Sequence, residues 1–275
     1  MSDTPEQPLI RLPRFKPRGG LEVMYASIRA LFLRELQTRF GHYRIGYLWA
    51  FLEPALNVIF MLILFGAIMK RTLPGIDYTV FLLNGILPFF VFMRSATQSL
   101  SAIQSNQGLL SYRSVKPIDT VIARTTLETL LYFFCYLILT LIIIWFGLSI
   151  SFSQIPLLLF LWLILYIFSI GFSCIMMVIG EFLPEVGKLI GAVFIVVYFM
   201  SGAMIPLHIV PEKYLVFFLW NPIAHLLELM RASVAPTYSI LHGVSLSYVL
   251  MSTLTVVFLG LLLTVAFTDR MVKTK

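Results

Sequence analysis

Charged and polar side chains interrupt the apolar stretches of this sequence at a few positions. Arg94, Gln98, Ser101 and Ser105 recur at helical spacing and form one polar stripe. An ionised side chain inside a membrane is costly, and it usually faces the interior of a helix bundle or water. The stripe therefore predicts one wet helix face. The alternative is that the spanning helix ends near residue 94 and the rest lies at the cytosolic interface.

Glu53 and Pro54 stand near the start of a second apolar stretch, RIGYLWAFLEPALNVIFMLILFGAIM at residues 44–69. A proline in the first turns of a helix sacrifices few backbone hydrogen bonds, and a carboxylate there can still reach the headgroup region. The pair therefore predicts the entry of a spanning helix at the inner leaflet. Glu53 would pair with Arg39, Arg44 or a partner subunit; otherwise it extends to the headgroups.

The sequence lacks the common motifs for nucleotide binding, metal binding and nucleophilic catalysis. It has no GxxxxGK[ST] phosphate-binding loop, no HExxH or CxxC pair and no nucleophile elbow. The one constellation suited to a membrane-embedded transferase is Glu212 with His225 and Glu228. Arg124 and Glu128, four residues apart, are interpreted as an ion pair within one helix. We therefore expect no catalytic site, metal site or cofactor in this chain.

Composition places the chain in a lipid bilayer. Hydrophobic residues make up 59% of it and charged residues 12%, and mean hydropathy is +0.93. Such values are typical of polytopic membrane proteins and exclude a water-soluble domain. A spanning helix needs about 20 mostly apolar residues, and the predicted fold is an all-α polytopic membrane protein with six transmembrane helices. They are expected at residues 48–69, 78–100, 121–148, 155–180, 187–205 and 244–268.

The distribution of Lys and Arg predicts the orientation in the membrane. Six crossings put both termini on one side, and the segments on that side carry 15 of the 20 basic residues, against 4 on the other side. The remaining one, Arg94, falls within a span. Because basic residues favour the cytosolic side, both termini are predicted to be cytosolic.

Segments outside the spans are expected at the membrane surface. Residues 1–20 predict a flexible cytosolic tail before a transmembrane domain at 21–275. Residues 21–42 carry apolar side chains at three- and four-residue steps, which predicts an amphipathic helix in the cytosolic interface, or else a soluble helix packed on a partner. Residues 205–239 are apolar but broken by prolines, and they predict re-entrant helices between spans five and six, with Asn221 as a helix cap.

Three motifs in this order are recognisable. They are YRIGYLWAFLEPALNV after the amphipathic helix, FMSGAMIPLHIVPEKY closing the fifth span, and NPIAHLLELMR in the re-entrant segment. Together they resemble the membrane subunits of ABC-2 type exporters, and closest of all the capsular polysaccharide export permeases of Gram-negative bacteria, the group of KpsM, BexB and CtrC. The similarity covers nearly the whole chain from about residue 20, whereas the proline-rich start carries no family signature.

The resemblance implies a half-transporter of the bacterial inner membrane that dimerises with a second copy of itself and pairs with two ATPase subunits. ATP and Mg would bind to the ATPase and not to this chain. A periplasmic adaptor and an outer-membrane export protein are implied as further partners, a lipid-linked acidic polysaccharide as cargo, and no nucleic acid. The interfacial helix and the loop between spans two and three would contact the ATPase. The implied coupling residues are Arg39, Tyr43, Tyr112, Arg113 and Lys116.

An acidic cargo suggests a role for basic residues in or beyond the membrane. Several spaced positive charges would lower the cost of moving carboxylates or phosphates through a region of low dielectric constant without trapping them. The candidate substrate path consists of Arg44, Glu53, Lys70, Arg71, Arg94, Gln98 and Arg231. In the alternative, Lys70 and Arg71 extend to headgroups and Arg231 pairs with Glu228. Export of O-antigen, teichoic acid, a drug or another amphiphile, and the transferase, stay open as other functions.

Overall fold

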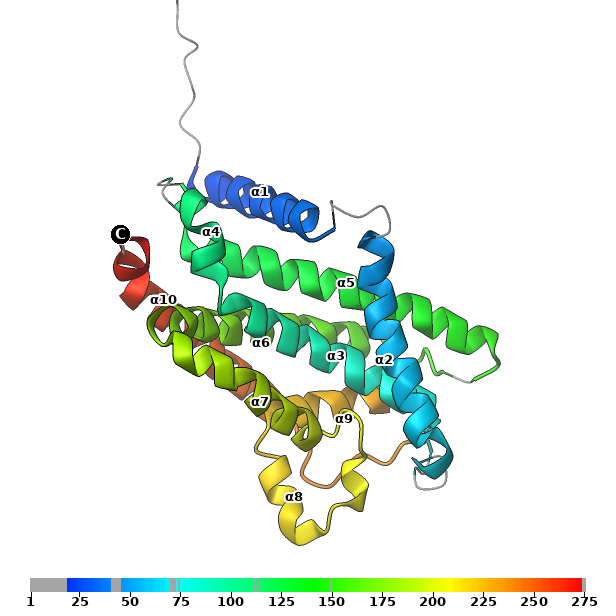
Figure 1. The fold of residues 1–275 in the computed structure, drawn as a ribbon. Coiled ribbons are helices and arrows are strands. Elements are labelled where there is room, and N and C mark those ends of the chain that lie inside the picture. The colour runs from blue at the N-terminus through cyan, green and yellow to red at the C-terminus, as the bar shows by residue number, and fades with distance from the viewer. Residues whose placement is uncertain are drawn as a thin grey trace, which may run out of the picture.

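The computed structural model describes residues 19–40, 46–69, 73, 75–110, 112, 114–148 and 150–273, and every regular element in this part of the chain is helical (Figure 1). The elements are α1 (Gly20–Phe40), α2 (Gly46–Met69), α3 (Tyr78–Ser99), α4 (Ala102–Leu110), α5 (Pro117–Trp145), α6 (Ile155–Phe182), α7 (Pro184–Met200), the short 3-10 helix η1 (Leu207–Ile209), α8 (Glu212–Phe218), α9 (Pro222–Val234) and α10 (Leu246–Lys273). Residues 1–18 of the predicted tail lie outside the described residues.

Helices occupy all six predicted spans, as α2, α3, α5, α6, α7 and α10. Within the described ranges, four of them are long and apolar enough to cross a membrane by themselves, namely α3, α5, α6 and α10. The pair of α8 and α9, bent by 106°, adds a fifth if it is one broken span. The apolar stretch of α2, Leu52–Phe65, is shorter, and α7 has 17 residues. The structure therefore shows an all-α membrane protein with four to five candidate spans, and the count of six stays a prediction.

α3 lies at the centre of the bundle. It packs against α2, α5, α6, α7 and α9, and 78% of its apolar stretch is buried. Asp77 fixes its start, because the carboxylate accepts a hydrogen bond from the Thr79 backbone N–H at 2.8 Å. Its fully buried side chains include Phe81, Leu82, Leu83, Ile86, Leu87 and Phe89. A helix held on so many sides gives Arg94, near its end, a well-defined position.

Prolines mark the first turn of four helices, where a missing N–H removes no helical hydrogen bond. They are Pro117 in α5, Pro156 in α6, Pro184 in α7 and Pro222 in α9. The predicted cap of α9 is confirmed, because Asn221 Oδ1 accepts a hydrogen bond from the Ile223 backbone N–H at 3.0 Å. The proline-rich segment after α7 is therefore broken into short helices, as predicted, although its re-entrant placement in a membrane stays a prediction.

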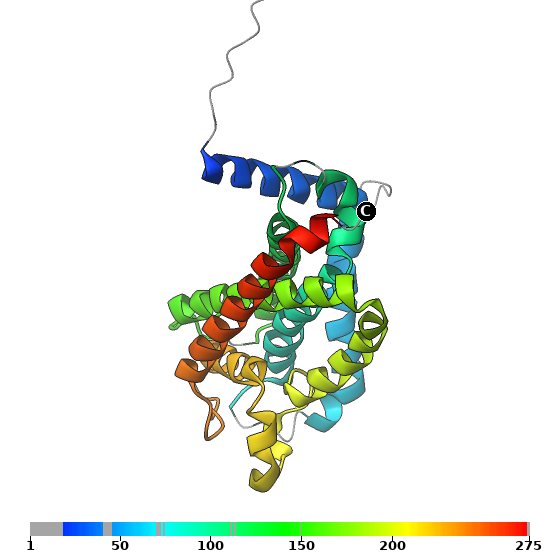
Figure 2. The ribbon, with the colours of Figure 1, turned by 90° about the vertical axis from the view of Figure 1, so that its left-hand side faces the viewer.

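The two ends of the molecule differ in character. α1, α4 and the end of α10 lie at one end, here called the α1 end, and α8 lies at the other, the α8 end (Figures 1 and 2). α1 packs on α5 of its own chain and buries Ser27, Leu31 and Phe40, whereas Leu21 and Tyr25 are exposed. The structure thus shows a helix over residues 21–40 of the predicted 21–42, and its amphipathic, interfacial character stays a prediction.

Candidate functional site

Two ion pairs join α1 to α5. The Glu35 carboxylate lies 3.0 Å from Arg124 Nε, and Arg39 Nη1 lies 2.5 Å from Glu128 Oε1. Glu35 and Arg39 are one helical turn apart, as are Arg124 and Glu128, so the two helices run in the same direction along this contact (Figure 1). These four residues are called the α1–α5 ladder below.

The predicted ion pair between Arg124 and Glu128 within α5 is wrong. Each residue pairs instead with an opposite charge on α1. The Glu128 side chain is only 3% exposed, and burying a carboxylate requires a close cationic partner, which the Arg39 guanidinium supplies. Arg124 Nη1 in turn donates to the Gln98 carbonyl oxygen at 2.6 Å. The arginine therefore links α1 and α5 to the end of α3.

Arg94 on α3 pairs with Glu53 on α2. The partners predicted for Glu53 were different: Arg39 is engaged by Glu128, and Arg44 lies outside the described residues. α3 continues past Arg94 to Ser99, and whether the membrane span ends near residue 94, with the rest of the helix at the cytosolic interface, stays open. Arg94 and Gln98 are partly exposed, and the stripe continues on exposed Ser101 and Ser105. The polar stripe thus lies on an accessible face, and its contact with water stays a prediction.

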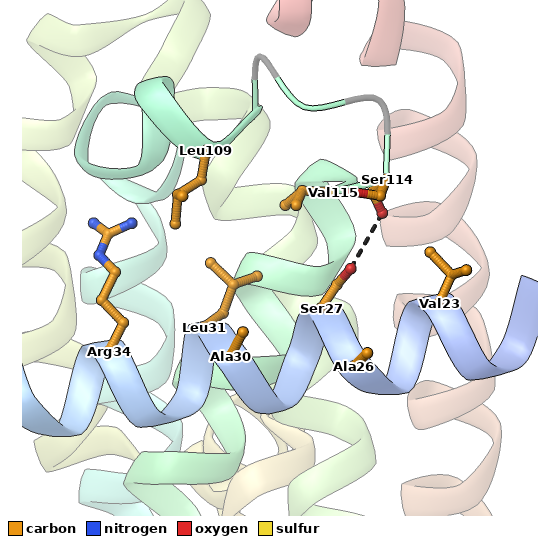
Figure 3. A pocket seen from close by; sticks show the side chains of 9 residues that line it. All are labelled: Val23, Ala26, Ser27, Ala30, Leu31, Arg34, Leu109, Ser114 and Val115. Atoms are coloured by element: carbon orange, nitrogen blue, oxygen red, sulfur yellow. Dashed lines mark hydrogen bonds between the residues drawn. The ribbon is translucent and has the colours of Figure 1, made fainter. Parts of the chain in front are cut away.

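A groove at the α1 end runs between α1 and the segment from α4 to α5 (Figure 3). Its volume is about 490 Å³, and it is lined by Val23, Ala26, Ser27, Ala30, Leu31, Arg34, Leu109, Ser114 and Val115. Ser27 Oγ donates to the Ser114 carbonyl oxygen at 3.2 Å, and Arg34 Nη2 donates to the Ser105 carbonyl oxygen at 2.8 Å. These hydrogen bonds hold α1 and the α4 segment on the two sides of the groove.

The predicted coupling residues are distributed around this end. Tyr112 and Lys116 are exposed, next to the groove residues Ser114 and Val115. Arg39 belongs to the α1–α5 ladder and points at α5. The other two coupling residues, Tyr43 and Arg113, lie outside the described residues, as do Lys70 and Arg71 of the predicted substrate path.

Arg231 on α9 is fully buried, and the alternative in which it pairs with Glu228 is confirmed. Arg231 Nη1 lies 2.7 Å from Glu228 Oε1, Nη2 donates to the Gly202 carbonyl oxygen at 2.7 Å, and the guanidinium lies 3.5 Å from the centre of the Phe81 ring. Both charged side chains are 0% exposed. Within the single chain Arg231 therefore joins α9 to α3 and to the turn after α7, and it presents no surface to a cargo.

Tyr238 completes this buried cluster. Its hydroxyl donates to Glu228 Oε2 at 2.9 Å, and burial raises the pKa of the phenol further above its usual range. Two of the residues suggested for a transferase site have structural partners. Glu228 binds Arg231 and Tyr238. His225 contacts the Leu219 carbonyl oxygen through Nε2 at 2.7 Å and the Ser245 backbone N–H through Nδ1 at 3.0 Å. Glu228 and His225 are therefore engaged in holding the fold.

Sequence reasoning missed Glu35 and Tyr238. Glu35 and Arg39 are four residues apart, as are Arg124 and Glu128, but the acidic residue comes first in one pair and the basic residue comes first in the other. That complementary spacing was the available signal for the ladder. Tyr238 follows α9 in a proline-containing turn, and nothing in the local sequence points to Glu228.

A family model described as ABC-2 type transporter matches residues 26–235, which is most of the chain. The chain belongs to the ABC-2 type transporter family. In this ABC-2 transporter chain, the matched region begins within α1 and ends directly after α9, so it includes the ladder, the Glu53–Arg94 pair and the buried Glu228–Arg231 pair.

Several individual bacterial transport and export proteins are similar to this chain. The polysialic acid transport protein KpsM of Escherichia coli is 47% identical over 246 residues, which cover 90% of this chain and 95% of KpsM. The capsule polysaccharide export inner-membrane protein CtrC of Neisseria meningitidis serogroup B is 27% identical over 78% of this chain and 80% of its own length. The O-antigen export system permease protein RfbA of Klebsiella pneumoniae is 24% identical over 77% of this chain and 81% of its own length.

Proposed function

We propose that this chain is the transmembrane subunit of an ATP-driven exporter that moves a lipid-linked acidic capsular polysaccharide across the bacterial inner membrane. The observation that carries the proposal is the 47% identity to KpsM over 90% of the chain, because KpsM is a polysialic acid transport protein. The working unit contains two copies of the chain and two copies of a separate ATPase, which binds ATP and Mg.

The α1 end is the side that meets the ATPase in this proposal. The supporting observations are the groove between α1 and the α4 segment and the exposed Tyr112 and Lys116 at its edge. With six crossings and the excess of basic residues, this end faces the cytosol together with both termini. The α8 end then faces the periplasm, where the adaptor and the outer-membrane export protein receive the cargo.

The cargo passes the face that carries Glu53, Arg94 and Gln98. Support comes from their exposure on two neighbouring helices, since charged groups within a membrane require water or protein around them. Arg231 is not part of this face, because it is fully buried against Glu228, α3 and the turn after α7. One second candidate function, export of O-antigen, is supported by the similarity to RfbA.

Complementation tests this function. The chain is expressed together with the ATPase subunit of its own system in an Escherichia coli strain that lacks KpsM, and surface polysialic acid is measured with an antibody on intact cells. We expect surface polymer to return only when both genes are present. A matched strain lacking its O-antigen permease is the comparison. Restoration of O-antigen without polysialic acid would contradict the proposal and favour the second function.

A further inference from the structure

The four ion pairs found among the described residues differ in how deeply they are buried. The exposed fractions of the two side chains are 0% and 0% for Arg231–Glu228, 7% and 16% for Arg124–Glu35, and 24% and 3% for Arg39–Glu128. For Arg94–Glu53 they are 36% and 49%. Of these four, the Arg94–Glu53 pair alone has two accessible partners.

Exposure decides whether an ion pair can open. Separating a buried pair leaves a charge without water or counter-ion, which is strongly unfavourable. An exposed pair contributes little where water reaches it, because water solvates the separated groups nearly as well, and the proposed function places water and cargo on the face of Arg94 and Glu53. Glu53 can therefore leave Arg94 without a large penalty, whereas Glu228 and Arg231 stay joined.

The position of the pair makes such opening useful. Arg94 sits near the end of α3, the helix held most firmly in the bundle, while Glu53 belongs to α2, which contributes fewer residues to the core. The polar stripe of Gln98, Ser101 and Ser105 continues from Arg94 toward the α1 end. The arginine is thus the fixed member of the pair, and the glutamate is the member that can turn away.

We propose that Glu53 is an internal counter-ion for Arg94 that an anionic group of the cargo displaces and that returns when this group has moved on. The ligand class is a carboxylate or phosphate carried on a polymer. This inference rests on the proposed function for the identity of the cargo, and it concerns the regulation of the same face.

The exchange has two consequences for transport. Arg94 is never left as an uncompensated cation, so no single anion is bound tightly enough to stall the polymer. A neutral glycan has no group that can replace the Glu53 carboxylate, so the pair stays closed in its presence. Glu53 therefore sets how strongly Arg94 attracts anions.

Binding of a defined polymer tests the exchange. The full-length chain is placed in nanodiscs of phosphatidylcholine, which carries no net charge, and titrated with short fluorescent oligosialic acid at low ionic strength. Removing the competing carboxylate with Glu53→Gln should tighten binding by about two- to five-fold, the range expected for loss of an exposed ion pair. Arg94→Gln and the double variant Glu53→Gln/Arg94→Gln should both lose binding, and Arg94→Lys should retain part of it.

Two controls separate the exchange from general charge effects. Glu185→Gln, at an exposed glutamate in the first turn of α7, changes the net charge by the same amount as Glu53→Gln. It should bind oligosialic acid with the same affinity as the wild-type chain. Oligosialic acid with reduced carboxyl groups should bind all variants alike. Helix content and the elution volume in size-exclusion chromatography identify any variant that has failed to fold.

The inference is overturned if Glu53→Gln binds oligosialic acid no more tightly than the wild-type chain, or if Arg94→Gln binds it as well as the wild type. Its failure is distinguishable from failure of the proposed function. If the chain complements the strain lacking KpsM but Glu53→Gln does not change binding, the proposed function is supported and the exchange is contradicted. If the variants show the expected binding pattern but the chain does not complement, the anion site is supported and the proposed function is contradicted.

Discussion

At the scale of single residues, the buried cluster around Arg231 depends on a glycine in α3. A Cβ atom added at Gly85 would lie 2.0 Å from the Ala203 carbonyl oxygen and 2.6 Å from Arg231 Nη2. Both distances are below any ordinary contact, and the carbonyl belongs to the backbone and cannot turn aside. Gly85 therefore permits the close approach through which Arg231 reaches the Gly202 carbonyl oxygen.

Gly85→Ala should lower the free energy of unfolding by about 1–3 kcal/mol, the usual cost of forcing an extra carbon into a packed core. The measurement is thermal unfolding of the purified chain in detergent. Gly191→Ala in α7 is the matched control, because a Cβ there meets nothing within 4 Å. Its stability should be unchanged or slightly higher, since alanine is the better helix former. Equal stability of the two variants would show that the contact at Gly85 relaxes freely.

At the scale of helices, the α1–α5 ladder pairs two partly buried charges of α1 with more deeply buried charges on α5. Glu128 is 3% exposed and Arg124 is 7% exposed, so each depends on its α1 partner more than the reverse. Movement of α1 relative to α5 would leave these charges unpaired. The ladder therefore fixes the register of α1 on the bundle.

A double-mutant cycle on Arg39 and Glu128 tests this dependence. Arg39→Gln leaves a buried carboxylate without its cation. The double variant Arg39→Gln/Glu128→Gln should therefore be destabilised by less than the sum of the effects of the two single variants. The coupling energy should fall at about 0.5–3 kcal/mol, as for residues in direct contact. Thermal unfolding of the wild type and the three variants supplies the four values. Additive effects would mean that the pair contributes no specific stability.

The helices were predictable and the ladder was not, for a physical reason. Apolar length, prolines at helix starts and the Asn221 cap are local features, and they placed the helices within a few residues. The partner of Arg39 lies 89 positions away along the chain. A local argument therefore chose the nearest opposite charge for Glu128, which was Arg124, and missed the partner that packing supplies.

At the scale of the whole molecule, α1 and the end of α10 lie at the same end, which an even number of crossings requires (Figures 1 and 2). The distribution of basic residues predicts that this end faces the cytosol. The two native cysteines, Cys135 and Cys174, are buried, so an introduced surface cysteine can report on sidedness.

A cysteine at position 213, in exposed α8, should react with a membrane-impermeant thiol reagent in intact spheroplasts. One at position 273 should react only after the inner membrane is opened. Gel-shift labelling of each variant, with the wild-type chain as the unlabelled control, makes the measurement. Labelling of position 273 from outside would contradict six crossings with cytosolic termini.

The ladder also has a consequence for how the chain is made. Synthesis runs from the N-terminus, so α1 leaves the ribosome with Glu35 and Arg39 before their partners on α5 exist. Three helices, α2 to α4, are translated in the interval. During that time water and lipid headgroups are expected to satisfy the charges of α1, which would hold the helix at the membrane surface in the predicted orientation. The emergence of α5 would then recruit α1 to the bundle, so α1 docks after α2 to α4 although it is synthesised before them.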